Sequence, residues 1–184
     1  MRRHPLLIYR RRVAGWRLPA LLIAAACGLL WWFAPAVFPA EALETASWAL
    51  LLGMAAGAAL LLYALLAPAF AFVECRPAYL LISTPLYRLA ISYSRMRTAR
   101  PVKFAPAVAG LRRELVAPFW GGTALFVDLT GYPFPEPWLR FWFGWFMFAP
   151  QLGTGLQFVV PDWMALSRDV EEGRVTWKTR RQRR

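Results

Sequence analysis

The sequence is poor in the side chains that most often carry catalysis or bind metals. Its 184 residues include one histidine, two cysteines and ten Asp and Glu residues. His4 has no second histidine or cysteine at metal-ligand spacing, so we interpret it as a surface residue. No histidine is placed to activate serines such as Ser83 and Ser94. We therefore predict a protein without catalysis, metal or cofactor, and keep a membrane enzyme only as a third alternative.

Charge is absent from two long apolar runs. Residues 18–38 and 48–73 contain no Asp, Glu, Lys or Arg, and each is long enough to cross about 30 Å of hydrocarbon. We predict a transmembrane hairpin over residues 18–73, with Thr45 or Ser47 capping the second helix and Pro68 kinking or ending it. A lipoprotein-type signal around Cys27 is a weaker alternative, because the apolar run continues far beyond such a segment.

The positive charge surrounds these runs. Six basic residues precede residue 18, eight lie between Arg76 and Arg113, and seven lie from Arg168 onward, in a chain of net charge +12. The connection between the runs carries Glu41 and Glu44 but no Lys or Arg. This asymmetry follows the positive-inside rule. We predict a multi-pass protein of the bacterial cytoplasmic (inner) membrane with both termini in the cytoplasm, and no nucleic-acid partner.

Small residues recur four positions apart in both apolar runs, at Ala24 and Gly28 and at Gly53 and Gly57. Residues four apart share one helix face, and small side chains let two helix backbones approach closely. The spacing has two interpretations: the helices dock onto another membrane subunit, or they pack on each other. A homo-oligomer is also compatible with it.

From residue 74 onward the pattern changes to alternation. The segment "YLLISTPLYRLAISY" predicts two antiparallel strands with a turn around Pro85. "TALFVDL" after Gly121 and Gly122 and "LQFVV" near the C-terminus predict further strands, whereas residues 105–116 are ambiguous. The stretch beginning "PDWMALSRDV" predicts an amphipathic helix over residues 162–178, with Asp162 as its N-cap.

This order of elements resembles the bacterial pleckstrin-homology-like (PH-like) two-pass membrane proteins. The residues that carry the resemblance are "AYLLISTPLYRLAISYSRMR", "GTGLQFVV" and the terminal helix. The resemblance implies a small antiparallel PH-like β domain over residues 74–178, used to recognise lipid headgroups or proteins. We expect a basic cytoplasmic leader over residues 1–17 before the hairpin and a basic tail over residues 179–184 after the domain.

The stretch "WLRFWFGWFMF" holds seven aromatic residues in eleven positions, 138–148. It is too short to span a bilayer and is bounded by prolines. Neither a helical nor a strand period confines its rings to one side, so we weigh a lipid or subunit contact against an ordinary core. The candidate contact residues are Trp138, Phe141, Trp142, Phe143, Trp145 and Phe146.

A second candidate surface is basic. Its residues are Arg88, Arg95, Arg97, Arg100 and Lys103, which could face anionic headgroups or merely flank the membrane segments. The leading hypothesis is an accessory or scaffold subunit that contacts other membrane-protein subunits through its small-residue helices and aromatic surface. The alternative is a module that binds anionic membrane lipids.

Overall fold

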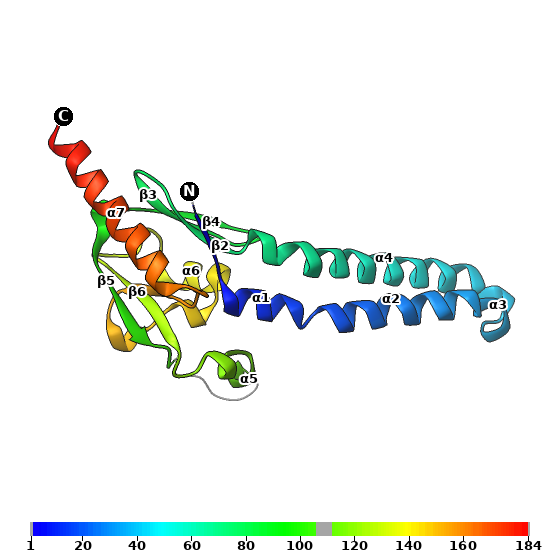
Figure 1. Cartoon of the computed structure of the whole chain (residues 1–184). Helices are drawn as coiled ribbons and strands as arrows, with labels where there is room; N and C mark the ends of the chain where they lie inside the picture. Colours follow the sequence, from blue (N-terminus) through cyan, green and yellow to red (C-terminus); the bar gives the residue numbers. More distant parts are fainter. Residues whose placement is uncertain (1, 106–111, 184) are drawn as a thin grey trace. The chain divides into compact units, whose positions relative to one another are not determined.

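The computed structural model describes residues 2–105 and 112–183, with the side chains of residues 40, 41, 112 and 113 outside the description. The chain divides into two compact units (Figure 1). The sheet unit comprises Met1–Arg10 and Ala69–Arg184, and the helical unit comprises Arg11–Pro68. The helical unit is therefore an insertion within the sequence of the sheet unit.

The helical unit is built from Leu- and Ala-rich helices. Its elements are α1 (Leu7–Ala14, which begins in the sheet unit), α2 (Arg17–Trp32), α3 (Ala34–Val37) and α4 (Ala40–Phe70, whose last two residues belong to the sheet unit). The continuous segments Leu7–Trp32 and Ala42–Phe70 are long and apolar enough to cross a membrane. The prediction of two helices that are long and apolar enough to cross a membrane is confirmed.

The limits of the helices differ from those expected. Neither Thr45 nor Ser47 caps α4, because the helix begins at Ala40; the Ser47 hydroxyl donates instead to the Leu43 carbonyl at 2.7 Å. Pro68 lies inside the last turn of α4, which ends at Phe70. The acidic connection is therefore largely helical rather than an open loop.

The small residues bring α2 and α4 together within the helical unit (Figure 1). A Cβ atom on Gly57 would lie 2.8 Å from the Ala24 backbone nitrogen, and one on Gly53 would lie 2.8 Å from Cys27 Sγ. Gly28 faces Met54 at 3.6 Å. Of the two interpretations of the spacing, the structure therefore supports packing of the two helices on each other.

The sheet unit contains a four-stranded antiparallel sheet, sheet A, in the order β1-β2-β3-β4. Its strands are β1 (Arg3–Pro5), β2 (Phe72–Cys75), β3 (Tyr79–Ser83) and β4 (Arg88–Ser92). The expected β3–β4 hairpin is confirmed. β1 was not expected, because three residues including a proline show no alternation; the segment interpreted as a leader begins as a strand.

A three-stranded antiparallel sheet, sheet B, has the order β5-β6-β7. It consists of β5 (Met96–Lys103), β6 (Thr123–Leu129) and β7 (Gly155–Phe158). Residues 106–111 of the ambiguous segment lie outside the described residues, and α5 (Arg112–Val116) follows them. The "TALFVDL" strand is confirmed as β6, and the "LQFVV" strand is confirmed as β7 except for Val159 and Val160, which follow its end at Phe158.

The C-terminal helix α7 (Trp163–Gln182) packs against strands of both sheets. The Asp162 side chain accepts a hydrogen bond from the Ala165 amide at 2.8 Å, so the expected N-cap is confirmed. Leu166 and Val170, on the face of α7 that packs against the sheets, are fully buried. Gly173 is required at its position, because a Cβ there would collide with the Tyr93 ring of the turn after β4.

Candidate functional site

One end of sheet A is where the helical unit enters and leaves the sheet unit. Pro5 pairs with Phe72, Phe72 with Ser83, and Ser83 with Arg88. The Leu6 amide donates to the Ala71 carbonyl at 3.1 Å, just before α1 begins and just after α4 ends. We call the row of paired residues Pro5, Phe72, Ser83 and Arg88 the helix-linked end of sheet A.

The aromatic stretch packs at this same end. Its first part forms α6 (Glu136–Phe143), and Trp145–Met147 form a 3₁₀ turn. The Tyr9 hydroxyl donates to the Trp142 carbonyl at 3.0 Å. The Tyr87 ring, in the β3–β4 turn, stacks on the Trp142 ring with centroids 5.4 Å apart. These contacts attach α6 to the helix-linked end.

The six candidate contact residues divide by burial. Phe143 and Phe146 lie in the core of the sheet unit, and Trp142 and Trp145 are partly buried. Trp138 and Phe141 are 51% and 74% exposed, and Leu86 of the adjacent β3–β4 turn is 70% exposed. The stretch is thus both core and surface. We call Leu86, Trp138, Phe141 and Trp142 the apolar rim.

The candidate basic residues do not form one cluster. Arg88 is exposed at the helix-linked end, whereas β4 carries the chain over five residues, about 13 Å, to the turn that holds Arg95. The Arg97 carbonyl accepts from Arg174 of α7 at 2.7 Å, Arg100 lies over the Phe126 ring, and Lys103 pairs with Thr123 on sheet B. Only Arg88 adjoins the apolar rim.

The opposite end of sheet A carries a charged cluster that the sequence did not predict. Glu74 accepts hydrogen bonds from Arg3 Nε at 3.1 Å and Arg76 Nε at 3.0 Å. Burial opposes ionisation of Glu74, but the two guanidinium partners outweigh burial and lower its pKa. Arg76 also donates to the Tyr79 hydroxyl at 3.1 Å. The cluster joins β1, β2 and β3.

His4 corrects the interpretation of a surface residue. Its side chain is buried, and its Nε2 lies 2.8 Å from Asp169 Oδ2 of α7. A lone histidine in an arginine-rich segment gave no sequence signal for this pairing, because the partners are 165 positions apart. The contact joins the strand before the apolar hairpin to the helix at the C-terminus.

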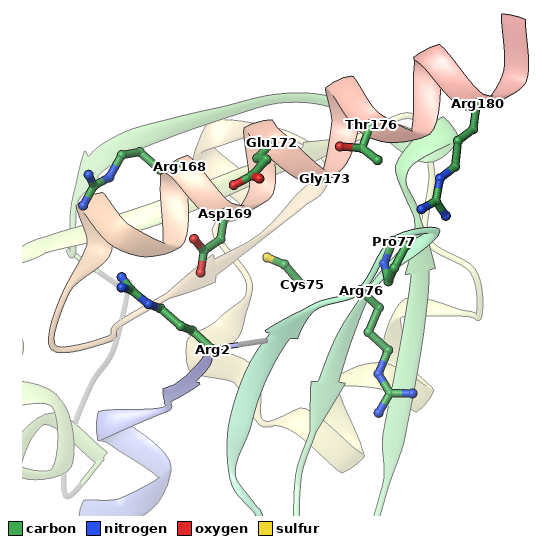
Figure 2. A pocket seen from close by; sticks show the side chains of 10 residues that line it. All are labelled: Arg2, Cys75, Arg76, Pro77, Arg168, Asp169, Glu172, Gly173, Thr176 and Arg180. Atoms are coloured by element: carbon green, nitrogen blue, oxygen red, sulfur yellow. The ribbon is translucent and has the colours of Figure 1, made fainter. Parts of the chain in front are cut away.

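Beside this pair lies a cleft of about 560 Å³ between α7 and the β2–β3 turn (Figure 2). Its lining includes four arginines, Arg2, Arg76, Arg168 and Arg180, and two acidic residues, Asp169 and Glu172. Cys75 of β2 and Gly173 of α7 also line it (Figure 2). The charged lining of the cleft is net positive.

The thiol that lines the cleft is held in its protonated form. Burial, together with the nearby Asp169 carboxylate, raises the pKa of the Cys75 thiol to about 12, so Cys75 is protonated near neutral pH. Within residues 2–105 and 112–183, no group of three or more His, Cys, Asp and Glu side chains is arranged to hold a metal ion.

Comparison with known proteins adds no assignment to this geometry. No family model, curated protein or solved structure matches the chain.

Proposed function

We propose that this chain is a non-catalytic two-pass protein of the bacterial cytoplasmic membrane that serves as an accessory or scaffold subunit of a larger membrane complex. The observation that carries the two-pass topology of this proposal is the pairing of β1 with β2, which precede and follow the inserted helical unit in the sequence. Strands that pair in one sheet lie on one side of a membrane. Two crossings between them return the chain to that side, and the basic flanks favour the cytoplasmic side.

The apolar rim supports a contact with the membrane surface. The rim belongs to the sheet-unit end that leads, within a few residues, into α1 and out of α4. Trp rings favour the headgroup layer, where the ring is buried and its N–H is hydrated, and Phe and Leu side chains insert at the boundary between headgroups and acyl chains. We infer that Leu86, Trp138 and Phe141 rest in this layer and hold the sheet unit against the membrane.

The PH-like resemblance is part of the same proposal. Short antiparallel strands in two sheets, followed by a helix that packs on strands of both, support a PH-like β domain. In this interpretation the transmembrane hairpin is inserted between the first two strands of the β domain. The first strand then comes from the basic segment that precedes the hairpin.

Binding of anionic lipid is the second candidate function. One observation favours it: Arg88 is exposed beside the apolar rim, at the helix-linked end. A near-surface arginine gains about 1 kcal/mol from an anionic membrane. Because the other four candidate basic residues lie away from this row, we place selective lipid recognition second.

Native-gel migration after mild detergent extraction tests the leading proposal, with mass spectrometry of the proteins that migrate with the chain. We expect a large assembly of defined composition. Migration as a single chain or a small homo-oligomer would contradict the accessory-subunit role. Flotation with liposomes of zwitterionic and anionic lipid, at low and high salt, would then test the lipid-binding alternative, since attraction to headgroups weakens as salt rises.

A further inference from the structure

The charged cleft adjoins a second, apolar hollow. This hollow, of about 260 Å³, is lined by Pro77, Ala78, Trp177, Arg180 and Arg181. It shares Pro77 and Arg180 with the cleft. Together they form one groove along α7 from Arg168 to Arg181, with a charged section and an apolar section, which we call the α7 groove.

Several arginines of the groove are available to a ligand. Within the described part of the chain, Arg2, Arg168 and Arg180 form no hydrogen bond or ion pair. Arg76, by contrast, is held by Glu74 and Tyr79, and Figure 2 shows its side chain pointing away from α7. Asp169 is already held by His4. The free groups of the groove therefore favour an anionic ligand.

The spacing of these arginines sets the size of the ligand. Arg168 and Arg180 are twelve positions apart on α7, which corresponds to about 18 Å along a helix. Figure 2 shows their side chains at opposite ends of the cleft. One phosphate or carboxylate is too small to reach both. An extended peptide of five or six residues covers this length, at about 3.3 Å per residue.

The apolar section distinguishes among elongated anions. Trp177 and Pro77 offer a surface for an aliphatic or aromatic side chain, which an acidic peptide can carry and an inorganic polyphosphate cannot. The Arg181 guanidinium lies over the Trp177 ring, 5.6 Å from its centroid.

We propose that the α7 groove binds an extended acidic peptide segment of a partner protein, with its carboxylates on Arg2, Arg168 and Arg180 and one apolar side chain on Trp177. This names the partner chemistry of the proposed accessory subunit, on whose role the proposal rests. Paired arginine–carboxylate contacts supply the charge-assisted hydrogen bonds, and the apolar anchor supplies selectivity over other anions.

The test uses the full chain in nanodiscs of zwitterionic lipid. The probe is a fluorescein-labelled peptide of twelve residues, in which glutamates flank a central Leu-Phe pair. Binding is followed by fluorescence anisotropy. In the groove variant, Arg2→Gln is combined with Arg180→Gln. In the matched control, Lys178→Gln is combined with Arg183→Gln, which also removes two positive charges, at the C-terminal end of α7 and outside the groove lining. Thermal unfolding of every variant checks the fold.

We expect the groove variant to weaken peptide binding at least tenfold and the control less than twofold. Trp177→Ala should weaken binding of the Leu-Phe peptide but not of an all-glutamate peptide. Three results would overturn the proposal: no binding to the folded wild type, equal losses in the two double variants, or equal competition by a twelve-nucleotide oligothymidine. Because peptide binding is read without the native complex, its failure is distinct from failure of the accessory-subunit role.

Discussion

His4 Nε2 lies 2.8 Å from Asp169 Oδ2, so the first strand of sheet A is fixed to the C-terminal helix. β1 is short and lies at the edge of the sheet, where three residues of pairing alone hold a strand weakly. The buried imidazole gives β1 a second attachment. Through β1, the same contact ties α7 to the segment from which α1 starts.

We expect Asp169→Ala to destabilise the sheet unit by about 1–3 kcal/mol, because the buried His4 imidazole would lose its partner. Asp169→Asn should recover part of this loss, since an amide oxygen still accepts a hydrogen bond. Thermal unfolding in detergent measures the change. Glu171→Ala on the same helix removes an exposed ion pair with Arg174 and serves as the control, with a loss of at most about 1 kcal/mol. Equal losses in Asp169→Ala and Glu171→Ala would contradict a structural role for the His4 contact.

Acid should weaken the sheet unit through Glu74. Its pKa is lowered in the folded chain from a reference of 4.5, so the ionised carboxylate stabilises the fold above about that pH. This contribution is lost as pH falls through the folded pKa. We therefore expect the stability difference between wild type and Glu74→Gln to be largest near pH 7 and to shrink on acidification below pH 4.5. A difference that is independent of pH would refute the carboxylate's role.

Cys75 should resist alkylation while the chain is folded. With a thiol pKa of about 12, the thiolate fraction at pH 8 is on the order of 10⁻⁴. In a Cys27→Ala background, we expect iodoacetamide to modify Cys75 at least a hundredfold more slowly in the native chain than in the denatured chain. Mass spectrometry of timed samples gives both rates. Comparable rates would show a reactive thiol and reopen a catalytic role for the cleft.

The packing of α2 on α4 can be tested by a disulfide. A Cβ at position 53 would lie 3.7 Å from Cys27 Cβ, within the range of 3.5–4.5 Å that disulfides adopt. In a Cys75→Ala background, Gly53→Cys should therefore form an intramolecular disulfide with Cys27 on mild oxidation. Nonreducing gels and mass spectrometry distinguish it from a crosslink between chains. A predominantly intermolecular product would favour docking of these helices onto another copy.

Much of the fold follows from local sequence patterns. Uncharged runs around Ala24 and Gly57 predict long helices, alternation around Leu89 and Ile91 predicts β4, and Asp162 before an amphipathic pattern predicts the start of α7. Each of these signals lies within a few residues of the element that it predicts. Such predictions depend little on the rest of the chain.

The remaining features depend on contacts that are distant in sequence. β1 pairs with β2 across the whole inserted helical unit, and nothing local to residues 3–5 indicates a strand. Phe143 is buried while its neighbour Phe141 is exposed, because Tyr87 of the β3–β4 turn covers one side of α6. The α7 groove combines residues from the N-terminal segment, the β2–β3 turn and the C-terminal helix. No pattern within one segment could have brought them together.

The central claim is that the apolar rim rests in the headgroup layer, and the depth of a spin label tests it most directly. Single labels at Phe141→Cys on the rim and Val175→Cys on α7, both exposed positions, are compared in a Cys27→Ala/Cys75→Ala chain in liposomes. For each spin label, we compare relaxation by oxygen, which concentrates in the bilayer, with relaxation by a water-soluble nickel chelate. We expect oxygen to dominate at position 141 and the nickel chelate at position 175. Equal, high exposure of both labels to the nickel chelate would contradict the claim.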